Sequence, residues 1–389
     1  MNIISLENKY QLPTYTKLPL IITKGKGAYI WDQAGKKYLD FYGGHAVALI
    51  GHCHPKIIDA VNKQINKLIF YSNVVYNDQR ALTAKKLIDL SPNQFASVFF
   101  CNSGTEANET AIKLAKKYTG RDEVISFIGS FHGRTLGSLS VTGNEKYKKH
   151  IGSLMPNVKF ATFGDIESVK NLISNQTAAI ILEPIQSIAG VNEAEAAFYK
   201  QLGKLAKSKK VVLIFDEIQT GLGRTGKIFF SELIGVSPDI ITLAKGLAGG
   251  LPAGAVLVSK DITKSVQVDD QGSTFGGGPV ICAAISATLD VIKKEGLVKN
   301  ANRYGDILTQ KITGIKHVTS VTGKGLLLGI VLDVPALQVQ TMLLKKGVIT
   351  GTSANKNVLR IIPPITITSK EVYLFIKQLK QVLEQGTYE

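Results

Sequence analysis

The sequence lacks several features that mark whole classes of protein. Its 389 residues include only three cysteines, Cys53, Cys101 and Cys282. Three widely spaced cysteines argue against a disulfide framework and favour a reducing cytoplasm. No uninterrupted run of about 18 apolar residues occurs, so we expect no membrane-spanning helix and no membrane partner. The first ten residues mix polar and charged side chains and lack the apolar stretch of a signal peptide.

Acidic residues are also scarce: 30 Asp and Glu stand against 46 Lys and Arg, which gives a formal net charge of +16. Such a surface could bind nucleic acid, or it could attract anionic metabolites and reflect a lysine-rich composition. The lysines occur in short scattered groups, such as Lys85-Lys86 and Lys209-Lys210, without a dense basic tract. We therefore favour the second interpretation and expect no nucleic-acid partner.

The middle of the chain alternates short apolar segments with helical patterns. Six segments are rich in Val, Ile and Phe and apolar at nearly every position, as strands buried on both faces are. They are residues 97–101, 123–127, 179–182, 211–215, 240–243 and 254–258. Their alternation with helices predicts an α/β fold with a mostly parallel, doubly wound sheet, in which ligands bind at the carboxyl ends of the strands.

The two ends of the chain differ from the middle and predict a second, smaller α+β domain. An apolar, aromatic stretch near the N-terminus is typical of a small sheet, and strand-like segments and a final helix follow residue 280. We predict an N-terminal segment that joins the small domain, a large domain and a C-terminal small domain. Their ranges are 1–45, 46–278 and 279–389.

Two predicted strands end in polar residues that suit a cofactor. Ser103, Gly104 and Thr105 follow one strand and begin a helix, where free amides and two hydroxyls can hold a phosphate. The same residues also suit an ordinary capped helix. Asp216 follows the strand at 211–215, where it either caps the next loop or pairs with a positive group such as a pyridinium nitrogen. Each motif alone leaves both interpretations open.

Two further strand ends carry a lysine and an aromatic–arginine pair. Lys245 follows the strand at 240–243, where desolvation would lower its pKa and free the amine for carbonyl chemistry. A solvated lysine is the ordinary alternative. After the strand at 123–127, Phe131 could stack on a flat cofactor and Arg134 could bind a carboxylate. The alternative there is a plain loop. Together the four sites favour a cofactor.

In their order, these motifs resemble the class III aminotransferases, which use pyridoxal 5'-phosphate (PLP) and have PLP fold type I. The likeness runs from about Tyr15 to the final helix, and within the class it is greatest to the acetylornithine and succinylornithine aminotransferases. The stretch Phe131–Thr135, the short length and residues 357–364 point that way. The motifs are Ser103-Gly104-Thr105-Glu106-Ala107-Asn108, Phe131-His132-Gly133-Arg134-Thr135, Glu183-Pro184-Ile185-Gln186, Asp216-Glu217-Ile218-Gln219, Lys245-Gly246 and Ser273-Thr274-Phe275-Gly276-Gly277.

The resemblance implies how PLP is held. Lys245 would form the Schiff base with the cofactor and later move the substrate proton, and Asp216 would pair with the pyridinium nitrogen. Gln219 is expected near the phenolic oxygen, and Phe131 and Ile218 on the two faces of the ring. The other residues implied in cofactor binding are Ser103, Gly104, Thr105, His132, Glu183 and Thr274, of which Thr274 would reach the phosphate from the other subunit of a homodimer.

The resemblance also implies a substrate site. Arg134, with Ser273 nearby, would hold the α-carboxylate of the acylated ornithine, and Arg360 would bind the α-carboxylate of glutamate or 2-oxoglutarate. Tyr15 lies where related enzymes place a substrate-contacting tyrosine, and His45 is a candidate to line the substrate entrance. The implied reaction moves the amino group of N-acylornithine to 2-oxoglutarate in arginine biosynthesis, in two half-reactions.

The sequence departs from the family pattern at two places. The family usually has Gly-Glu after Gln186, and that carboxylate can mask the C-terminal arginine in relatives. Here Ser187 and Ile188 follow, so we expect Arg360 to stay available, which would suit a donor with an extra negative charge such as N-succinylornithine. Gly278 stands where the family usually has Asn, which leaves the placement of Thr274 less fixed.

Other interpretations remain. The same fold and cofactor could act on ornithine, 4-aminobutyrate or an aminoadipate-derived amine, and a PLP mutase or a basic nucleic-acid-binding protein are more distant alternatives. His52, Cys53 and His54, with His45, could suggest a metal site, but too few ligands lie close by. We expect no metal and interpret the segment as a turn before a helix at about residues 55–69.

Overall fold

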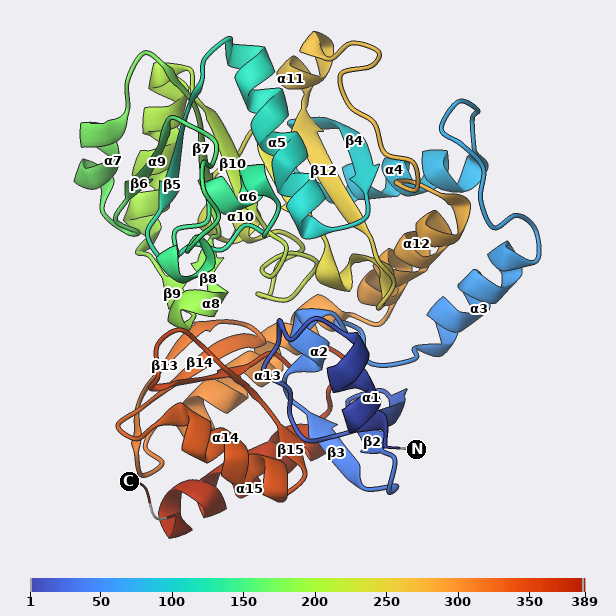
Figure 1. The fold of residues 1–389 in the computed structure, drawn as a ribbon, viewed down its shortest axis with the longest axis vertical. Helices are drawn as coiled ribbons and strands as arrows, with labels where there is room; N and C mark the ends of the chain where they lie inside the picture. The colour runs from blue at the N-terminus through green and yellow to red at the C-terminus, as the bar shows by residue number, and fades with distance from the viewer. Residues whose placement is uncertain (1, 387, 389) are drawn as a thin grey trace.

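The computed structural model describes residues 2–386 and residue 388, and it folds into two parts (Figure 1). The upper part in Figure 1 holds the large sheet, and the lower part contains segments from both ends of the chain. Among the described residues, no helix is both long enough and apolar enough to cross a membrane.

The large sheet confirms the predicted fold class. Its seven strands lie in the order β4-β12-β11-β10-β7-β5-β6. β12 is antiparallel to both of its neighbours, and the other neighbouring pairs are parallel. The strands are β4 (Phe95–Cys101), β5 (Glu123–Phe127), β6 (Val158–Ala161), β7 (Thr177–Leu182), β10 (Val212–Asp216), β11 (Ile240–Leu243) and β12 (Gly254–Ser259). The sequence did not predict β6, because it is a short edge strand that contains a lysine.

Successive residues along these strands pack into two different apolar clusters, so helices cover both faces of the sheet. Ile181 and Val212 pack with α5 (Gly104–Thr119), whereas Ile180 and Leu213 belong to the cluster that includes α9 (Ala196–Lys209) and α12 (Pro279–Lys294). Strands buried on both faces are apolar at nearly every position, which is the pattern that the sequence shows.

The lower part joins the two ends of the chain. One four-stranded sheet has the order β1-β2-β3-β15, in which the C-terminal β15 pairs in parallel with the N-terminal β3; the second has the order β13-β14-β17-β16. These strands are β1 (Ile22–Lys26), β2 (Tyr29–Asp32), β3 (Lys37–Asp40), β13 (Val318–Lys324), β14 (Leu327–Leu332), β15 (Val348–Ile349), β16 (Gly351–Thr352) and β17 (Val358–Ile361). The predicted final helix is α15 (Ser369–Gln385), whereas α3 (Pro55–Ile65) is shorter than predicted. The domain boundaries at residues 45 and 278 stay a prediction.

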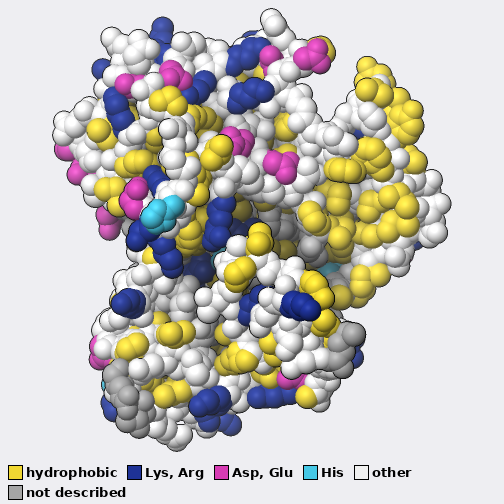
Figure 2. All heavy atoms as spheres, viewed as in Figure 1, with side chains coloured by type: hydrophobic (Ala, Val, Ile, Leu, Met, Phe, Trp, Pro, Cys, Tyr) yellow, Lys and Arg dark blue, Asp and Glu magenta, His cyan; other side chains and the backbone are white. Residues whose placement is uncertain are grey.

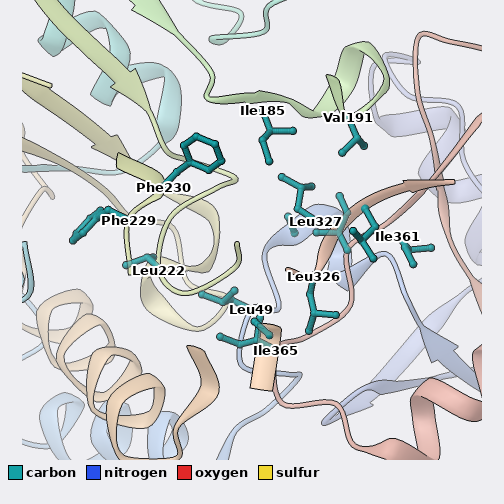
Figure 3. Close-up of a cluster of buried hydrophobic side chains, with 14 of the residues drawn as sticks. Leu49, Ile185, Val191, Leu222, Phe229, Phe230, Leu326, Leu327, Ile361 and Ile365 are labelled. Carbon is teal, nitrogen blue, oxygen red and sulfur yellow. The ribbon is translucent and has the colours of Figure 1, made fainter. Parts of the chain in front are cut away.

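Buried side chains from both parts meet in one core (Figure 3). Leu222 and Phe229 come from the loop between β10 and α10 (Phe230–Ile234), and Phe230 begins that helix. Leu326 and Ile365 of the lower part belong to the same buried cluster, with Ile365 on the side of Leu222. All of these side chains are nearly inaccessible to solvent, so their burial holds the two parts together.

Candidate active site

A cavity of about 450 Å³ opens at the carboxyl ends of β10 and β11. Parallel strands place the residues that follow them at one edge of the sheet, which brings together motifs far apart in the sequence. The cavity contains every predicted cofactor residue except Thr274. They are Ser103, Gly104, Thr105, Phe131, His132, Glu183, Asp216, Ile218, Gln219 and Lys245.

The N-terminus of α5 forms one wall of this cavity. Ser103 is the N-cap, and its hydroxyl accepts a hydrogen bond from the amide of Glu106 at 3.3 Å. The next amides, of Gly104 and Thr105, have no residue four positions earlier in the helix to accept from them and can donate to a phosphate. A Cβ atom at Gly104 would lie 2.5 Å from Cδ1 of Ile218, so a larger residue at this position would displace the Ile218 side chain that also lines the cavity.

Asp216 ends β10 and is held by three donors. Its Oδ2 atom accepts from Nδ2 of Asn108 at 2.8 Å and lies 2.8 Å from Nδ1 of His132, and its Oδ1 accepts from the amide of Ile218 at 3.2 Å. Asn108 is itself fixed, because its Oδ1 accepts from the hydroxyl of Thr242 at 2.8 Å. The carboxylate is therefore fixed and buried at the cavity wall, ready for a cationic ring nitrogen.

Lys245 follows β11 in a strained backbone conformation, with φ at +42°. Such strain in a residue other than glycine persists where the surroundings demand it, and it is concentrated at functional sites. Burial lowers the pKa of its amine from 10.5 to about 8, while Asp216 and Glu183 oppose that shift. A larger fraction of this amine than of an exposed lysine is thus neutral near physiological pH, and the neutral amine can attack a carbonyl.

The remaining polar atoms of the cavity indicate that a polar ligand belongs there. Burial raises the pKa of Glu183 to about 7, and its Oε1 accepts from the amide of Phe131 at 2.8 Å. Oε1 of Gln219 and Nε2 of His132 are buried and have no hydrogen-bond partner among the described residues. A helix N-terminus for phosphate, a carboxylate for a ring nitrogen and a reactive amine fit a flat aromatic aldehyde phosphate such as PLP.

A second cavity of about 960 Å³ shares Phe131 with the first and contains most of the predicted substrate residues. Its lining includes Tyr15, His45, Arg134 and Arg360. Figure 2 shows Lys and Arg side chains around the hollow between the two parts of the molecule. No Asp or Glu is among the described residues that line this cavity, so it suits anionic substrates.

Arg360 is the buried cation of this cavity. Its guanidinium lies between β16 and the segment that follows β8 (Ile185–Gln186). Nε donates to the carbonyl of Thr352 at 2.8 Å, and Nη1 donates to the hydroxyl of Ser187 at 3.0 Å. Burial lowers the pKa of the guanidinium, and within the described chain no Asp or Glu forms an ion pair with it. Ser187 therefore orients Arg360 without neutralising it, and the remaining guanidinium donors can take a carboxylate.

Two predicted residues lie outside both cavities. Thr274 is exposed, and Ser273 forms local contacts: its hydroxyl accepts from Nδ2 of Asn102 at 3.3 Å and from the amide of Gly276 at 3.0 Å. Within one chain, neither residue lines the site.

Two residues of the site that act through distant partners were not predicted from the sequence. Tyr42 lines the second cavity and contacts His45, and Asn108 fixes Asp216. Asn108 belongs to a quoted motif, but nothing local assigns it to a residue 108 positions later. Tyr42 follows a strand end, which is the one signal that could have indicated it.

The histidine-rich segment has structural contacts in place of a metal site. Nε2 of His52 lies 2.7 Å from Oδ2 of Asp40, and Nδ1 of His54 accepts from the amide of Lys56, in the first turn of α3, at 3.3 Å. Within residues 2–386 and 388, no group of three or more His, Cys, Asp or Glu side chains could hold a metal ion.

Comparisons with known proteins agree with this geometry. The family described as aminotransferase class-III matches residues 10–383. The acetylornithine aminotransferase of Methanocaldococcus jannaschii is 41% identical, over 99% of this chain and 98% of the relative. Ornithine aminotransferase 1 of Staphylococcus saprophyticus is 42% identical, over 97% of this chain and 98% of the relative. A solved structure of the ornithine aminotransferase from Toxoplasma gondii, with PLP at partial occupancy in its active site, is 30% identical, with a TM-score of 0.92 and coverage of 98% of this chain and 93% of that one.

Proposed function

This chain belongs to the class III aminotransferase family, and we therefore propose that it transfers the side-chain amino group of an N-acylated ornithine to 2-oxoglutarate. The products are N-acylglutamate 5-semialdehyde and glutamate, and the acyl group is acetyl or succinyl. In the biosynthetic direction glutamate is the amino donor, and the reaction belongs to arginine biosynthesis. The three cysteines are free, which suits a reducing cytoplasm.

One observation carries the proposal: a reactive lysine and a fixed carboxylate share a cavity that continues into an arginine-containing one. Lys245 and Asp216 line the first cavity, and Arg134 and Arg360 line the second. Transamination of substrates that carry carboxylates needs this combination, because the substrate amine must contact the cofactor while cations bind the substrate carboxylates.

PLP is the cofactor, and when bound it supplies an aldehyde for amino-group transfer and a ring that withdraws electrons from the substrate carbon. Lys245 would hold the aldehyde and would accept the proton that leaves the substrate carbon. Asp216 would hold a proton on the ring nitrogen, and Phe131 and Ile218 would flank the ring. Gln219 would contact the phenolic oxygen. Ser103, Gly104 and Thr105 would bind the phosphate, and His132 and Glu183 would support the ring.

Each of two arginines binds the α-carboxylate of a different substrate. Arg134 binds the α-carboxylate of the acylated ornithine; its Cζ lies 4.8 Å from the ring centre of Tyr147, which steers the guanidinium by a cation–π contact. Arg360 binds the α-carboxylate of glutamate or 2-oxoglutarate. Tyr15 and His45 line the path to this site.

We also propose that the active enzyme is a homodimer. An apolar face on one side of the molecule is exposed (Figure 2), and contiguous apolar surface of this kind marks an interface. Val74 is 84% exposed and Ile69 65%. The members of this apolar face are Ile65, Leu68, Ile69, Phe70, Tyr71, Val74, Val75, Tyr76 and Phe275.

The apolar face is connected to the loop that carries Thr274. Nδ2 of Asn73 donates to the carbonyls of Ser273 and Gly276 at 2.8 and 3.1 Å, and the rings of Phe70 and Phe275 lie 5.3 Å apart. A partner on this face would therefore bury the loop against its own surface, which supports the proposal that Thr274 serves the phosphate of the other subunit.

The absorbance of the purified holoenzyme tests the proposed function. N-acetylornithine, N-succinylornithine, ornithine and 4-aminobutyrate are added separately, and the loss of the visible cofactor band is followed. We expect one of the two acylated donors to react fastest. Faster reaction with ornithine or 4-aminobutyrate would overturn the substrate, and absence of a band after addition of PLP would overturn the enzyme class.

Ornithine is the second candidate donor, because the Staphylococcus saprophyticus relative named ornithine aminotransferase 1 is as similar to this chain as the acetylornithine enzyme is. The same four-donor experiment separates the two candidates.

A further inference from the structure

His45 lies in a left-handed backbone turn that is rare for residues other than glycine. Four consecutive residues, 43–46, have φ values of +60°, +55°, +65° and +68°. In this conformation the Cβ atom of an L-residue crowds the following carbonyl oxygen, so glycine is preferred. Gly43 and Gly44 meet that preference, but His45 and Ala46 do not. An unfavourable conformation that the surroundings enforce points to a position with a function.

Asp40 enforces the turn. Its carboxylate accepts from the amides of Tyr42, Gly43 and Gly44 at 3.0, 2.8 and 3.1 Å, and Nε2 of His52 lies 2.7 Å away on the same carboxylate. Asp40 itself is almost completely buried. The turn is therefore a fixed element that projects the side chain of His45 into the cavity that also holds Arg134 and Arg360.

Tyr42 determines which nitrogen of His45 can serve a ligand. Its phenol oxygen contacts Nδ1 of His45, and Cζ of Arg360 lies 5.8 Å from the centre of the same phenol ring. Nδ1 is therefore engaged within the protein, and Nε2 is the nitrogen that can serve a ligand. In the tautomer in which the phenol donates to Nδ1, Nε2 carries the hydrogen of the neutral ring.

The surroundings of His45 keep the ring neutral. Burial lowers the pKa of the imidazole to about 3, and the cations Lys245, Arg360 and Arg134 lower it further. With the phenol of Tyr42 donating to Nδ1, His45 presents a neutral Nε2–H donor beside the charged groups of Arg134 and Arg360.

We propose that His45 selects acylated amino donors, with its Nε2–H donating to the amide carbonyl oxygen of the N-acyl group. An amide is neutral and accepts a hydrogen bond at its oxygen. The free α-ammonium group of ornithine has no lone pair to accept from Nε2–H, and it would enter a cavity lined by Arg134 and Arg360. The inference rests on the proposed function and names what recognises the acyl group. Tyr42 is a positioning residue, since it acts through His45.

The test compares donors in the His45→Gly enzyme. Glycine accepts the left-handed backbone, so the variant removes the imidazole without adding strain. We expect kcat/KM for N-acetylornithine to fall about 10- to 100-fold relative to that for ornithine, the loss of one hydrogen bond to a neutral acceptor in a buried site. His45→Asn, which also tolerates this backbone and keeps a shorter donor, should lose less. Tyr42→Phe should lower the same ratio, mainly through KM.

The matched control is His150→Gly, because His150 also has left-handed backbone, with φ at +61°, but is exposed and outside both cavities. It should leave the ratio unchanged. An unchanged ratio in His45→Gly, or an equal loss for N-acetylornithine, ornithine and glutamate, would overturn the role of His45. A failure of the proposed function is separate: the wild-type enzyme itself would then not react with acylated donors.

Discussion

Oδ2 of Asp216 lies 2.8 Å from Nδ1 of His132, and both side chains are almost completely buried at the wall of the cofactor cavity. The same oxygen accepts a hydrogen bond from Asn108. Neither partner carries a permanent positive charge that would neutralise the carboxylate. Its negative charge can therefore stabilise a cationic ligand in the cavity, as a protonated cofactor ring would be.

Asp216→Asn should therefore lower kcat by about 100- to 1000-fold, because the amide keeps the shape but loses the charge that stabilises a protonated ring nitrogen. Steady-state rates with glutamate and the visible absorbance maximum measure the effect. Asp239→Asn is the matched control, since Asp239 is a carboxylate beside the opposite end of the same strands, where it accepts from the amide of Leu213. A loss below about tenfold in Asp216→Asn would contradict the assigned role.

The pKa of Lys245 predicts a pH dependence of cofactor uptake. Burial lowers this pKa to about 8, and only the neutral amine attacks an aldehyde. The rate of PLP incorporation into the apoprotein should rise about tenfold per pH unit below pH 8 and level off above it. Between pH 8 and 10.5 the folded apoprotein binds fewer protons than the unfolded chain, so its unfolding free energy should also rise with pH in that window. Stopped-flow absorbance measures uptake, and a rate that falls as pH rises would contradict the assignment.

Site residues could be predicted from the sequence where their placement depends on the adjacent strand, and could not where it depends on contacts between residues far apart in the chain. Lys245 and Asp216 follow apolar strands directly, so local pattern and the geometry of parallel sheets bring them to one edge. The contact of Ser187 with Arg360 spans 173 positions, and no local pattern encodes it. The left-handed turn at His45 depends on the carboxylate of Asp40 accepting three successive amides, which the residue types alone do not specify.

Ile188→Glu should weaken 2-oxoglutarate binding. Ile188 and Arg360 line the same cavity, and the neighbouring Ser187 already contacts the guanidinium. A new carboxylate there would pair with Arg360 and compete with the substrate, raising KM for 2-oxoglutarate about tenfold, or about 1.4 kcal/mol. Ile188→Gln, of similar size and without charge, is the control. Equal effects of the two changes would show that shape, not charge, governs the site.

The uncompensated charge of Arg360 also predicts the preference of the wild-type enzyme among donors. N-succinylornithine carries one more carboxylate than N-acetylornithine, and the second cavity has no acidic residue among its described lining to repel it. We expect kcat/KM for N-succinylornithine to exceed that for free ornithine by at least about tenfold. If succinylornithine reacts no better than ornithine, the idea that the missing carboxylate favours an anionic donor is wrong.

The apolar face predicts that a charge placed in its centre separates the subunits. Val74 is 84% exposed in the single chain, and in a dimer it would lose its contact with water, so Val74→Glu would bury an unpaired carboxylate. Light scattering after gel filtration should show a monomer with greatly reduced activity. Val268→Glu is the control, because Val268 is 91% exposed and lies outside the apolar face. A Val74→Glu protein that stays dimeric would place the interface elsewhere.

Subunit mixing tests whether Thr274 acts across that interface. Thr274→Glu should repel the cofactor phosphate, and Lys245→Ala removes the reactive amine, so each variant alone should be nearly inactive. If Thr274 serves the partner's site, a mixed dimer has one site in which both residues are native. Random reassociation of equal amounts makes about half of the dimers mixed, which restores about a quarter of wild-type activity. If Thr274 serves its own subunit, each chain carries one damaged site and mixing restores nothing. Thr274 is exposed and lines neither cavity of its own chain, so we expect the first result.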